Sequence, residues 1–360
     1  MKETREKTAE RGAKSPSLRF SGKREGLAPG VYVIYAVILV LVMLLCICVG
    51  SVNVPPGQTL RILFGGVPES ASYYSIIRVV RLPRVLCVAL TGASLSLSGA
   101  AMQGLLKNPL ADGSTLGVSS GASLGAVLAI ACGITFPSLP FAGTMIMAIL
   151  FAFLSLVIIM ALAYKFDNSL STNTIILIGI IFSMFANAVL SLIITFANDK
   201  LHTITFWTMG SLAGSSFQNA LVLAVVLFIG SCVILSQADE LNAFAIGEDN
   251  ARNIGVNVKG VRIAILITVS ALIGVCVSIG GTIAFVGLVS PHIIRLLTGP
   301  NHKRLLPASI FGGAVFLMLA DLVARTLLRP LELPLGVVTS LIGAVLFVVI
   351  FYRSSRGQGV

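Results

Sequence analysis

The sequence contains little charge, and acidic residues are especially scarce. Of its 360 residues, 14 are Asp or Glu and 25 are Lys or Arg, so 11% are charged, against roughly 25% in a typical soluble domain. This scarcity excludes a water-soluble globule, and the 56% of hydrophobic residues exclude a disordered chain. A polytopic membrane protein remains, and the mean hydropathy of +0.98 agrees with that class.

Several chemical motifs are also missing. The sequence has no G-x-x-x-x-G-K-[ST] phosphate-binding loop, so any ATP that drives this protein must be bound by another chain. Its three histidines are scattered, which argues against a metal site, and its six cysteines fall in apolar stretches, where a free thiol acts as a small hydrophobe. Because no H-E-x-x-H motif or nucleophile with a neighbouring base is present, we do not expect an enzyme.

Long windows without Asp, Glu, Lys or Arg predict membrane-spanning helices, each of which needs about 20 apolar residues. The window 113–164 is long enough for two spans with a turn at 133–140, and the window 201–238 is interrupted at 207–216. The runs are continuously apolar, which argues against a transmembrane β-barrel. The fold class is therefore an all-α polytopic membrane protein. Its ten predicted spans lie near 31–52, 82–105, 114–133, 141–164, 172–197, 217–236, 260–280, 283–297, 305–328 and 334–352.

The distribution of basic residues predicts the orientation. Ten spans place both termini on one side, and if that side is the cytoplasm, 18 of the 25 Lys and Arg residues fall on it and seven fall outside. This asymmetry follows the positive-inside rule. We therefore expect a basic cytoplasmic tail at 1–30, a transmembrane domain at 31–352 and a cytoplasmic tail at 353–360. The net charge of +11 then reports topology rather than nucleic-acid binding.

Polar residues between and inside the spans predict further features. The stretch 238–259 resembles two short amphipathic helices hinged near Gly247, and because a simple connector of that length is unusual, we interpret it as a cytoplasmic docking surface. Asp321 and Arg325 lie four residues apart in one span, which predicts an ion pair along the helix. Gln103 and Asn108 close the second span, where we expect a structural role first and a lining of the pathway second.

A series of short motifs runs through the chain from about residue 31 to 352. They are RLPR at 81–84, GASL at 92–95, NPLA at 108–111, LGVSSGA at 116–122, FWTMGSL at 206–212, AIGE at 245–248, GTIAFVGLVSPHIIR at 281–295 and ELPLG at 332–336. On these motifs the sequence resembles the FecCD family, the permease subunits of type II ABC importers for iron–siderophore complexes, haem and cobalamin.

The resemblance implies a ten-helix permease of the type II ABC importer fold in a bacterial or archaeal cytoplasmic (inner) membrane. The permease would form a homodimer, or a heterodimer with a paralogue, around a central pathway that moves a ferric-chelate cargo by alternating access. Two separate ATPase subunits would bind ATP and Mg, and an extracytoplasmic substrate-binding protein would deliver the cargo. No cofactor is expected on this chain, and its lipid partner is the bilayer.

The resemblance also implies roles for individual residues. The segment 241–255 matches coupling helices that seat in a groove of the ATPase. The implied coupling residues are Leu241, Phe244, Ile246, Gly247, Glu248, Ala251, Arg252 and Gly255. Arg81, Arg84 and Arg325 match basic positions that face acidic residues of the binding protein. Ser171 and Thr172, at the start of a span, match an inner gate.

Two alternatives stay open. The same machinery could carry haem or cobalamin, because the permeases for these cargoes share the motifs. A more distant alternative is a secondary transporter driven by an ion gradient, a class that uses acidic or histidine residues inside the membrane. Asp321 and His292 are the candidates for such a relay, and neither has an evident acidic partner in the sequence.

Overall fold

A computed structural model of the chain describes residues 29–357, apart from 68, 114–115, 135–141 and 169, and within these ranges the chain forms helices and turns without a strand. The predicted basic tail at 1–30 therefore lies almost entirely outside the described residues, as does most of the predicted turn at 133–140.

The predicted spans are confirmed as helices. Seven helices in the described ranges are long and apolar enough to cross a membrane, and three shorter apolar helices complete the ten predicted positions. The long helices are α1 (Pro29–Cys48), α4 (Leu82–Leu105), α6 (Ala142–Phe166), α7 (Thr172–Phe196), α9 (Phe217–Ser236), α12 (Val258–Gly280) and α14 (His302–Thr326). The shorter apolar ones are α5 (Val118–Cys132), α13 (Val286–Thr298) and α15 (Leu335–Gly357), the last of which runs into the predicted tail at 353–360.

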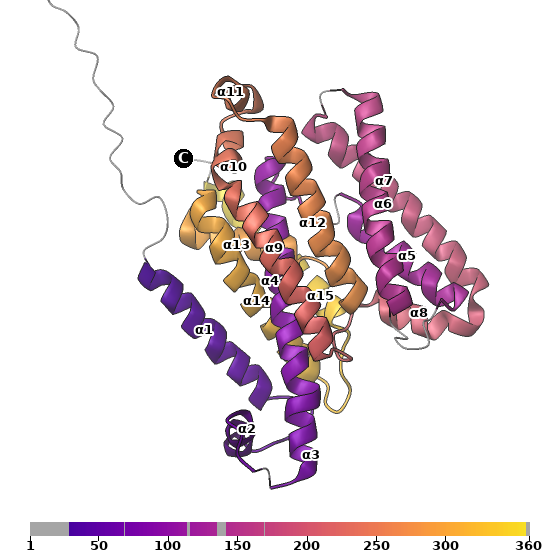
Figure 1. The fold of residues 1–360 in the computed structure, drawn as a ribbon, viewed down its shortest axis with the longest axis vertical. Coiled ribbons are helices and arrows are strands. Elements are labelled where there is room, and N and C mark those ends of the chain that lie inside the picture. The colour runs from indigo at the N-terminus through magenta and orange to yellow at the C-terminus, as the bar shows by residue number, and fades with distance from the viewer. Residues whose placement is uncertain (1–28, 68, 114–115, 135–141, 169, 358–360) are drawn as a thin grey trace, which may run out of the picture.

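Short helices cap the two ends of the bundle (Figure 1). At one end lie α2 (Pro56–Leu63) and α3 (Ala71–Tyr74), and α3 continues through the π-helix η1 (Ser75–Arg81) into α4. At the opposite end lie α10 (Ala238–Ala245) and α11 (Glu248–Asn253), the two short helices that the polar stretch predicts. A 3₁₀ turn, η2 (Asn198–Lys200), and α8 (Leu201–Thr208) follow α7.

The second span is longer than its sequence pattern suggests. The helix from Ala71 to Leu105 has 35 residues, about 50 Å of helix, whereas the hydrocarbon core of a bilayer is about 30 Å thick. The predicted span starts at 82 because the arginines before it count as loop charges. In the structure these arginines find partners, so the helix continues through them.

Helix α4 is the centre of the bundle and packs against α9, α12, α13 and α14. Glycines bring the backbones together at its crossings. A Cβ atom at Gly92 would fall inside van der Waals contact with the carbonyl oxygen of Gly313 on α14, and one at Gly99 would clash with that of Gly287 on α13. Small residues at crossings are typical of membrane helices, because close packing there replaces the hydrophobic effect.

The Gly99→Ala substitution is expected to destabilise the permease by at least about 1–3 kcal/mol, because a backbone carbonyl cannot rotate away from the added methyl group. Thermal unfolding in detergent measures the loss. The matched control is Gly214→Ala, since nothing lies within 4 Å of a Cβ at Gly214 and its φ is not in the left-handed region. Equal melting temperatures for the two variants would contradict close packing at this crossing.

Candidate functional site

The loop between α9 and α12 forms a compact unit at one end of the bundle (Figure 1). Leu241 and Phe244 of α10 and Ala251 of α11 are buried, so these apolar residues attach the loop to the helices beneath it. Gly247 separates α10 from α11 with a φ of +121°, a conformation that residues with a side chain rarely adopt. The hinge predicted near Gly247 is therefore confirmed.

The structure divides the eight implied coupling residues into three groups by burial. Leu241, Phe244 and Ala251 face the interior and cannot contact a partner. Ile246 is 64% exposed, and Arg252 and Gly255 are exposed as well. Gly247 and Glu248 are partly buried. The surface of the loop therefore carries an isoleucine at each end of α11, because Ile254 is also 65% exposed.

Helix α10 is bonded to the first residues of α14. The Asn242 side chain donates to Asn301 Oδ1 at 3.1 Å, and its own Oδ1 accepts the backbone N–H of His302 at 2.8 Å and contacts His302 Nδ1 at 2.9 Å. An ion pair of 2.8 Å between Lys303 and Asp239 adds to this attachment. The loop is thereby anchored on its α10 side.

A cleft of about 650 Å³ lies between α11 and the start of α7. Both predicted gate residues, Ser171 and Thr172, line this cleft together with Glu248 and Asn250 of α11. Lys107, just after α4, lines it as well. The structure thus brings the predicted gate and the predicted coupling segment to one place, although they are about 75 residues apart in the sequence.

Gln103 and Asn108 lie elsewhere. Gln103 is buried at the end of α4, where its amide donates to the carbonyl oxygens of Gly287 and Leu288 and its Oε1 accepts from Arg295 at 3.1 Å. Asn108 Oδ1 accepts the backbone N–H of Leu110 at 2.9 Å and closes a turn. Both residues stabilise local structure, which is the first of the two roles expected for them. Neither residue lines the cleft.

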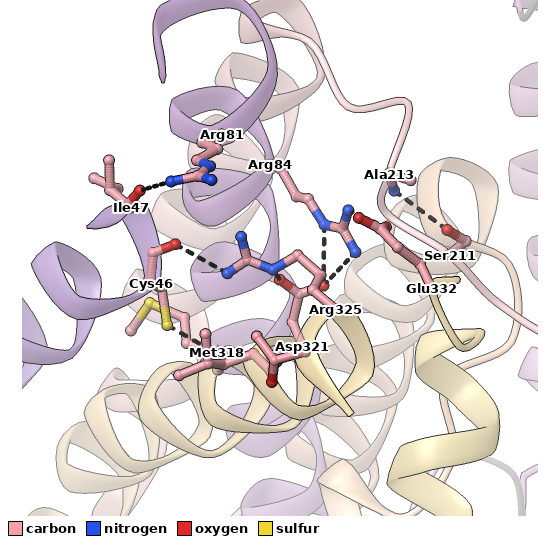
Figure 2. A network of polar contacts seen from close by, with 12 residues as sticks. Cys46, Ile47, Arg81, Arg84, Ser211, Ala213, Met318, Asp321, Arg325 and Glu332 are labelled. Atoms are coloured by element: carbon pink, nitrogen blue, oxygen red, sulfur yellow. Dashed lines mark hydrogen bonds and ion pairs between the residues drawn. The ribbon is translucent and has the colours of Figure 1, made fainter. Parts of the chain in front are cut away.

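The opposite end of the bundle contains a buried ionic network (Figure 2). Arg84 of α4 donates to Asp321 Oδ1 at 2.9 and 3.1 Å and to Glu332 at 2.6 Å. Arg325 pairs with the second oxygen of Asp321 at 2.9 Å, which confirms the predicted ion pair along α14, and also donates to the carbonyl oxygen of Cys46. One carboxylate therefore joins α4 to α14, and Arg325 joins both to the end of α1.

Arg81 completes this network through backbone acceptors. Its guanidinium donates to the carbonyl oxygens of Ile47 and Cys48 at 2.8 and 2.9 Å, and to that of Val52. These carbonyls belong to the end of α1 and the turn after it, where helix carbonyls have no partner within the helix. Arg81 therefore closes the C-terminal end of α1.

Arg81, Arg84 and Arg325, which the resemblance implies to face a binding protein, are not exposed in the structure, and the docking role implied for them stays a prediction. The three side chains are almost fully buried, and their desolvated guanidinium groups find the acceptors they need at the end of α1 and the turn after it, on Asp321 of α14 and on Glu332. The exposed basic residues at this end include Arg61 and Arg329.

Glu332 lies at the rim of the network, in the turn between α14 and α15. Partial burial by itself would raise the pKa of its carboxyl, but the hydrogen bond and charge of Arg84 outweigh this effect, so the pKa of Glu332 is held below its usual range. The carboxylate is consequently charged at neutral pH and neutralises part of the excess positive charge of the three arginines.

Comparison with known proteins places this architecture in a family. The family model described as the FecCD transport family matches residues 38–353, which is most of the chain. The chain belongs to the FecCD transport family. It is therefore a multi-pass membrane permease subunit of an ABC importer and not itself an enzyme, since ATP hydrolysis belongs to a separate chain. The alternative of a carrier driven by an ion gradient is not retained.

The relatives differ in what their names say they carry. The uncharacterized ABC transporter permease protein YvrB of Bacillus subtilis (strain 168) is 41% identical over 91% of this chain and 94% of its own length. The cobalamin import system permease protein BtuC of Halobacterium salinarum is 39% identical over 78% of this chain and 74% of its own. A solved structure of an inward-facing ABC transporter assigned to the metal-chelate type is 32% identical, with a TM-score of 0.78 over 90% of this chain and 99% of that one.

Two contacts of this FecCD permease were missed by sequence reasoning. Asn242 and His302 bond α10 to α14, but an asparagine in a polar loop carries no signal for its distant partner. The second contact is that of Arg262 with Leu170 and Glu248. In the sequence, Arg262 was only one of the 18 basic residues assigned to the cytoplasmic side. Its position directly before the charge-free window 263–294 is a signal that could have been followed, because an arginine at the start of an apolar span must find acceptors when it is buried.

Asp321→Asn is expected to destabilise this FecCD permease by about 3–5 kcal/mol, because it removes the full negative charge that compensates the buried Arg84 and Arg325. The melting temperature in detergent reports the loss. Asp199→Asn, which alters an exposed carboxylate, is the matched control and is expected to stay within about 0.5 kcal/mol of the parent. If Asp321→Asn were as stable as the control, the network would not hold the three helices together.

Proposed function

We propose that this permease forms a homodimer, or a heterodimer with a paralogue, that imports an iron–siderophore complex across a bacterial or archaeal cytoplasmic membrane by alternating access. Two ATPase subunits, which bind ATP and Mg, sit against α10 and α11, and a binding protein docks at the opposite end. Both termini are on the side of the ATPase. The observation that carries the proposal is the juxtaposition of α11 with Ser171 and Thr172 across one cleft, because it places a candidate partner-binding surface beside the candidate gate.

The exposed part of α11 suits a groove on the ATPase. Ile246 and Ile254 flank the helix and are exposed to 64% and 65%. They lie on a loop whose polar composition argues against contact with lipid. Burying one isoleucine side chain at a protein interface stabilises the complex by about 1.5–3 kcal/mol. Asn250 and Arg252, which are also exposed, provide polar contacts around the two anchors.

Docking of the binding protein is proposed at the end that carries α2 and α3. Arg61 and Arg329 are exposed there and can attract acidic residues of a partner. Exposed pairs of this kind contribute little affinity one by one, but together they set the orientation and raise the association rate. The buried arginines act indirectly, because they hold the ends of α1, α4 and α14 in place beneath this surface.

Replacing either Ile246 or Ile254 by Asp is expected to weaken binding of the purified ATPase at least about tenfold, since a charge would replace a buried apolar anchor. Interferometry on permease in nanodiscs gives the affinity. Phe64→Asp is the matched control: Phe64 is 86% exposed but lies at the α2 end, so the ATPase should bind this variant as it binds the parent. Normal binding by both isoleucine variants would show that α11 is not the contact surface.

An iron–siderophore cargo is supported by the 32% identical transporter of the metal-chelate type, which covers 90% of this chain. Cobalamin is the second candidate, favoured by the 39% identical cobalamin import permease. Few charged side chains occur in the spans, so the selection of cargo belongs to the binding protein rather than to this chain.

Proteoliposomes that contain the permease, its ATPase and its binding protein are expected to accumulate a ferric siderophore only with ATP inside. Uptake is measured for several ferric siderophores, hemin, cobalamin and molybdate, each in competition with the others. Preferential uptake of cobalamin, hemin or molybdate would replace the proposed cargo, and uptake without the ATPase would contradict the proposed mechanism.

A further inference from the structure

Arg262, the fifth residue of α12, joins three segments that are distant in sequence. Its side chain is 1% exposed. One terminal nitrogen donates to the carbonyl oxygen of Leu170 at 2.7 Å, and the other donates to Glu248 Oε1 at 2.5 Å. Leu170 directly precedes the candidate gate, and Glu248 is the first residue of α11. A single guanidinium therefore connects the candidate coupling helix to the turn before α7.

The turn that Arg262 contacts is strained. Leu170 has a φ of +55°, in the left-handed region, which costs a residue with a side chain about 1–2 kcal/mol. Asp167 supports the turn, because its carbonyl oxygen accepts the N–H of Leu170 and its carboxylate accepts the N–H of Ser171 at 3.1 Å. The same carboxylate accepts the Thr174 hydroxyl at 3.3 Å. Strained backbone persists where its surroundings hold it, and Arg262 supplies part of that hold.

Helix α11 is flanked by two glycines and has one buried side chain. Glycines with left-handed backbone flank it: Gly247 has a φ of +121° and Gly255 a φ of +93°. Ala251 is its buried residue, whereas most of its other side chains are exposed or only partly buried. Glu248 forms its ion pair with the buried Arg262 from a side chain that is 25% exposed.

We propose that Arg262 is a positioning residue that couples the position of α11 to the start of α7. Displacement of α11 carries Glu248 away from the guanidinium, which then loses its charged partner and shifts its bond to the Leu170 carbonyl. The strained turn relaxes, and Ser171 and Thr172 move with it. The inference rests on the proposed function, since it takes the ATPase to be what displaces α11.

Substitutions can separate this link from a purely structural role. Glu248→Gln keeps the size of the side chain and removes its charge. Arg262→Lys keeps a charge but has a single nitrogen that cannot reproduce the fixed fork of two donors. Asp239→Asn is the matched control, because it removes an ion pair of the same loop that attaches α10 to α14 and does not touch the turn before α7.

Hydrogen exchange on the permease alone in nanodiscs tests whether the contact holds the turn. The backbone amides of Ser171 and Ile175 are expected to exchange at least about fivefold faster in Glu248→Gln and Arg262→Lys than in Asp239→Asn. Equal rates in the three variants would overturn the link, and this result does not depend on any ATPase.

Labelling of the gate tests whether the contact transmits motion. Asn173 is exposed and lines the cleft, so Asn173→Cys is the reporter, in a chain with the exposed Cys132 and Cys232 replaced by alanine. The rate of maleimide labelling is compared in complexes without nucleotide and with ATP on a hydrolysis-deficient ATPase. We expect the labelling rate to change by at least about fivefold between these two states in the parent and in Asp239→Asn. In Glu248→Gln and Arg262→Lys we expect the ATPase to co-purify as before and the two rates to be nearly equal.

The outcomes distinguish a failure of the proposed coupling from a failure of the proposed function. Three results would overturn the coupling role of Arg262. The nucleotide-dependent change in labelling could persist in both Glu248→Gln and Arg262→Lys, or it could be lost in the Asp239→Asn control as well. It could also be absent from a parent permease that binds its ATPase. A parent permease that captures no ATPase would instead contradict the proposed function, and the proposed coupling would fall with it, whatever the exchange rates show.

Discussion

A guanidinium group in an apolar interior must be surrounded by acceptors, and this requirement shapes both ends of the bundle. At one end Arg81, Arg84 and Arg325 gather the last carbonyl groups of α1, the carboxylate of Asp321 and the rim carboxylate of Glu332. At the other end Arg262 gathers Leu170 and Glu248. Each guanidinium group joins segments that apolar packing alone would allow to slide past one another. Its directional hydrogen bonds fix the register of these segments, whereas contacts between apolar side chains do not.

Between these ends, close backbone packing makes the bundle a stiff connection. Helix α4 contacts α13 and α14 through glycines, so the backbones meet without intervening side chains that could change rotamer. The long helix from Ala71 to Leu105 runs from the end with the ionic network to the end with the cleft. In the proposed alternating access, this packing favours movement of whole helices over local rearrangement of side chains. Helix α11, flanked by Gly247 and Gly255, lies outside this packed centre.

The fold was largely predictable, and the candidate site was predictable in part. Charge-free windows located the ten spans, because the cost of charge in hydrocarbon acts on each segment separately. The polar stretch that forms α10 and α11 was identified for the same reason. The burial of Arg81, Arg84 and Arg325 was not predicted: counting charges assigns every arginine near a span end to the surface, whereas burial depends on whether a second helix offers Asp321 or free carbonyl groups.

The sequence by itself determined the class, the number of spans, the family resemblance and the spacing of Asp321 and Arg325, since these follow from hydrophobicity and local periodicity along one chain. Only the tertiary structure decided which charged groups meet. It brought Glu248, Leu170 and Arg262 together from three segments, and it separated the buried from the exposed residues of the coupling segment. The reason is geometric: a hydrogen bond forms over about 3 Å and within a narrow angle, so its partners are chosen by how whole helices cross.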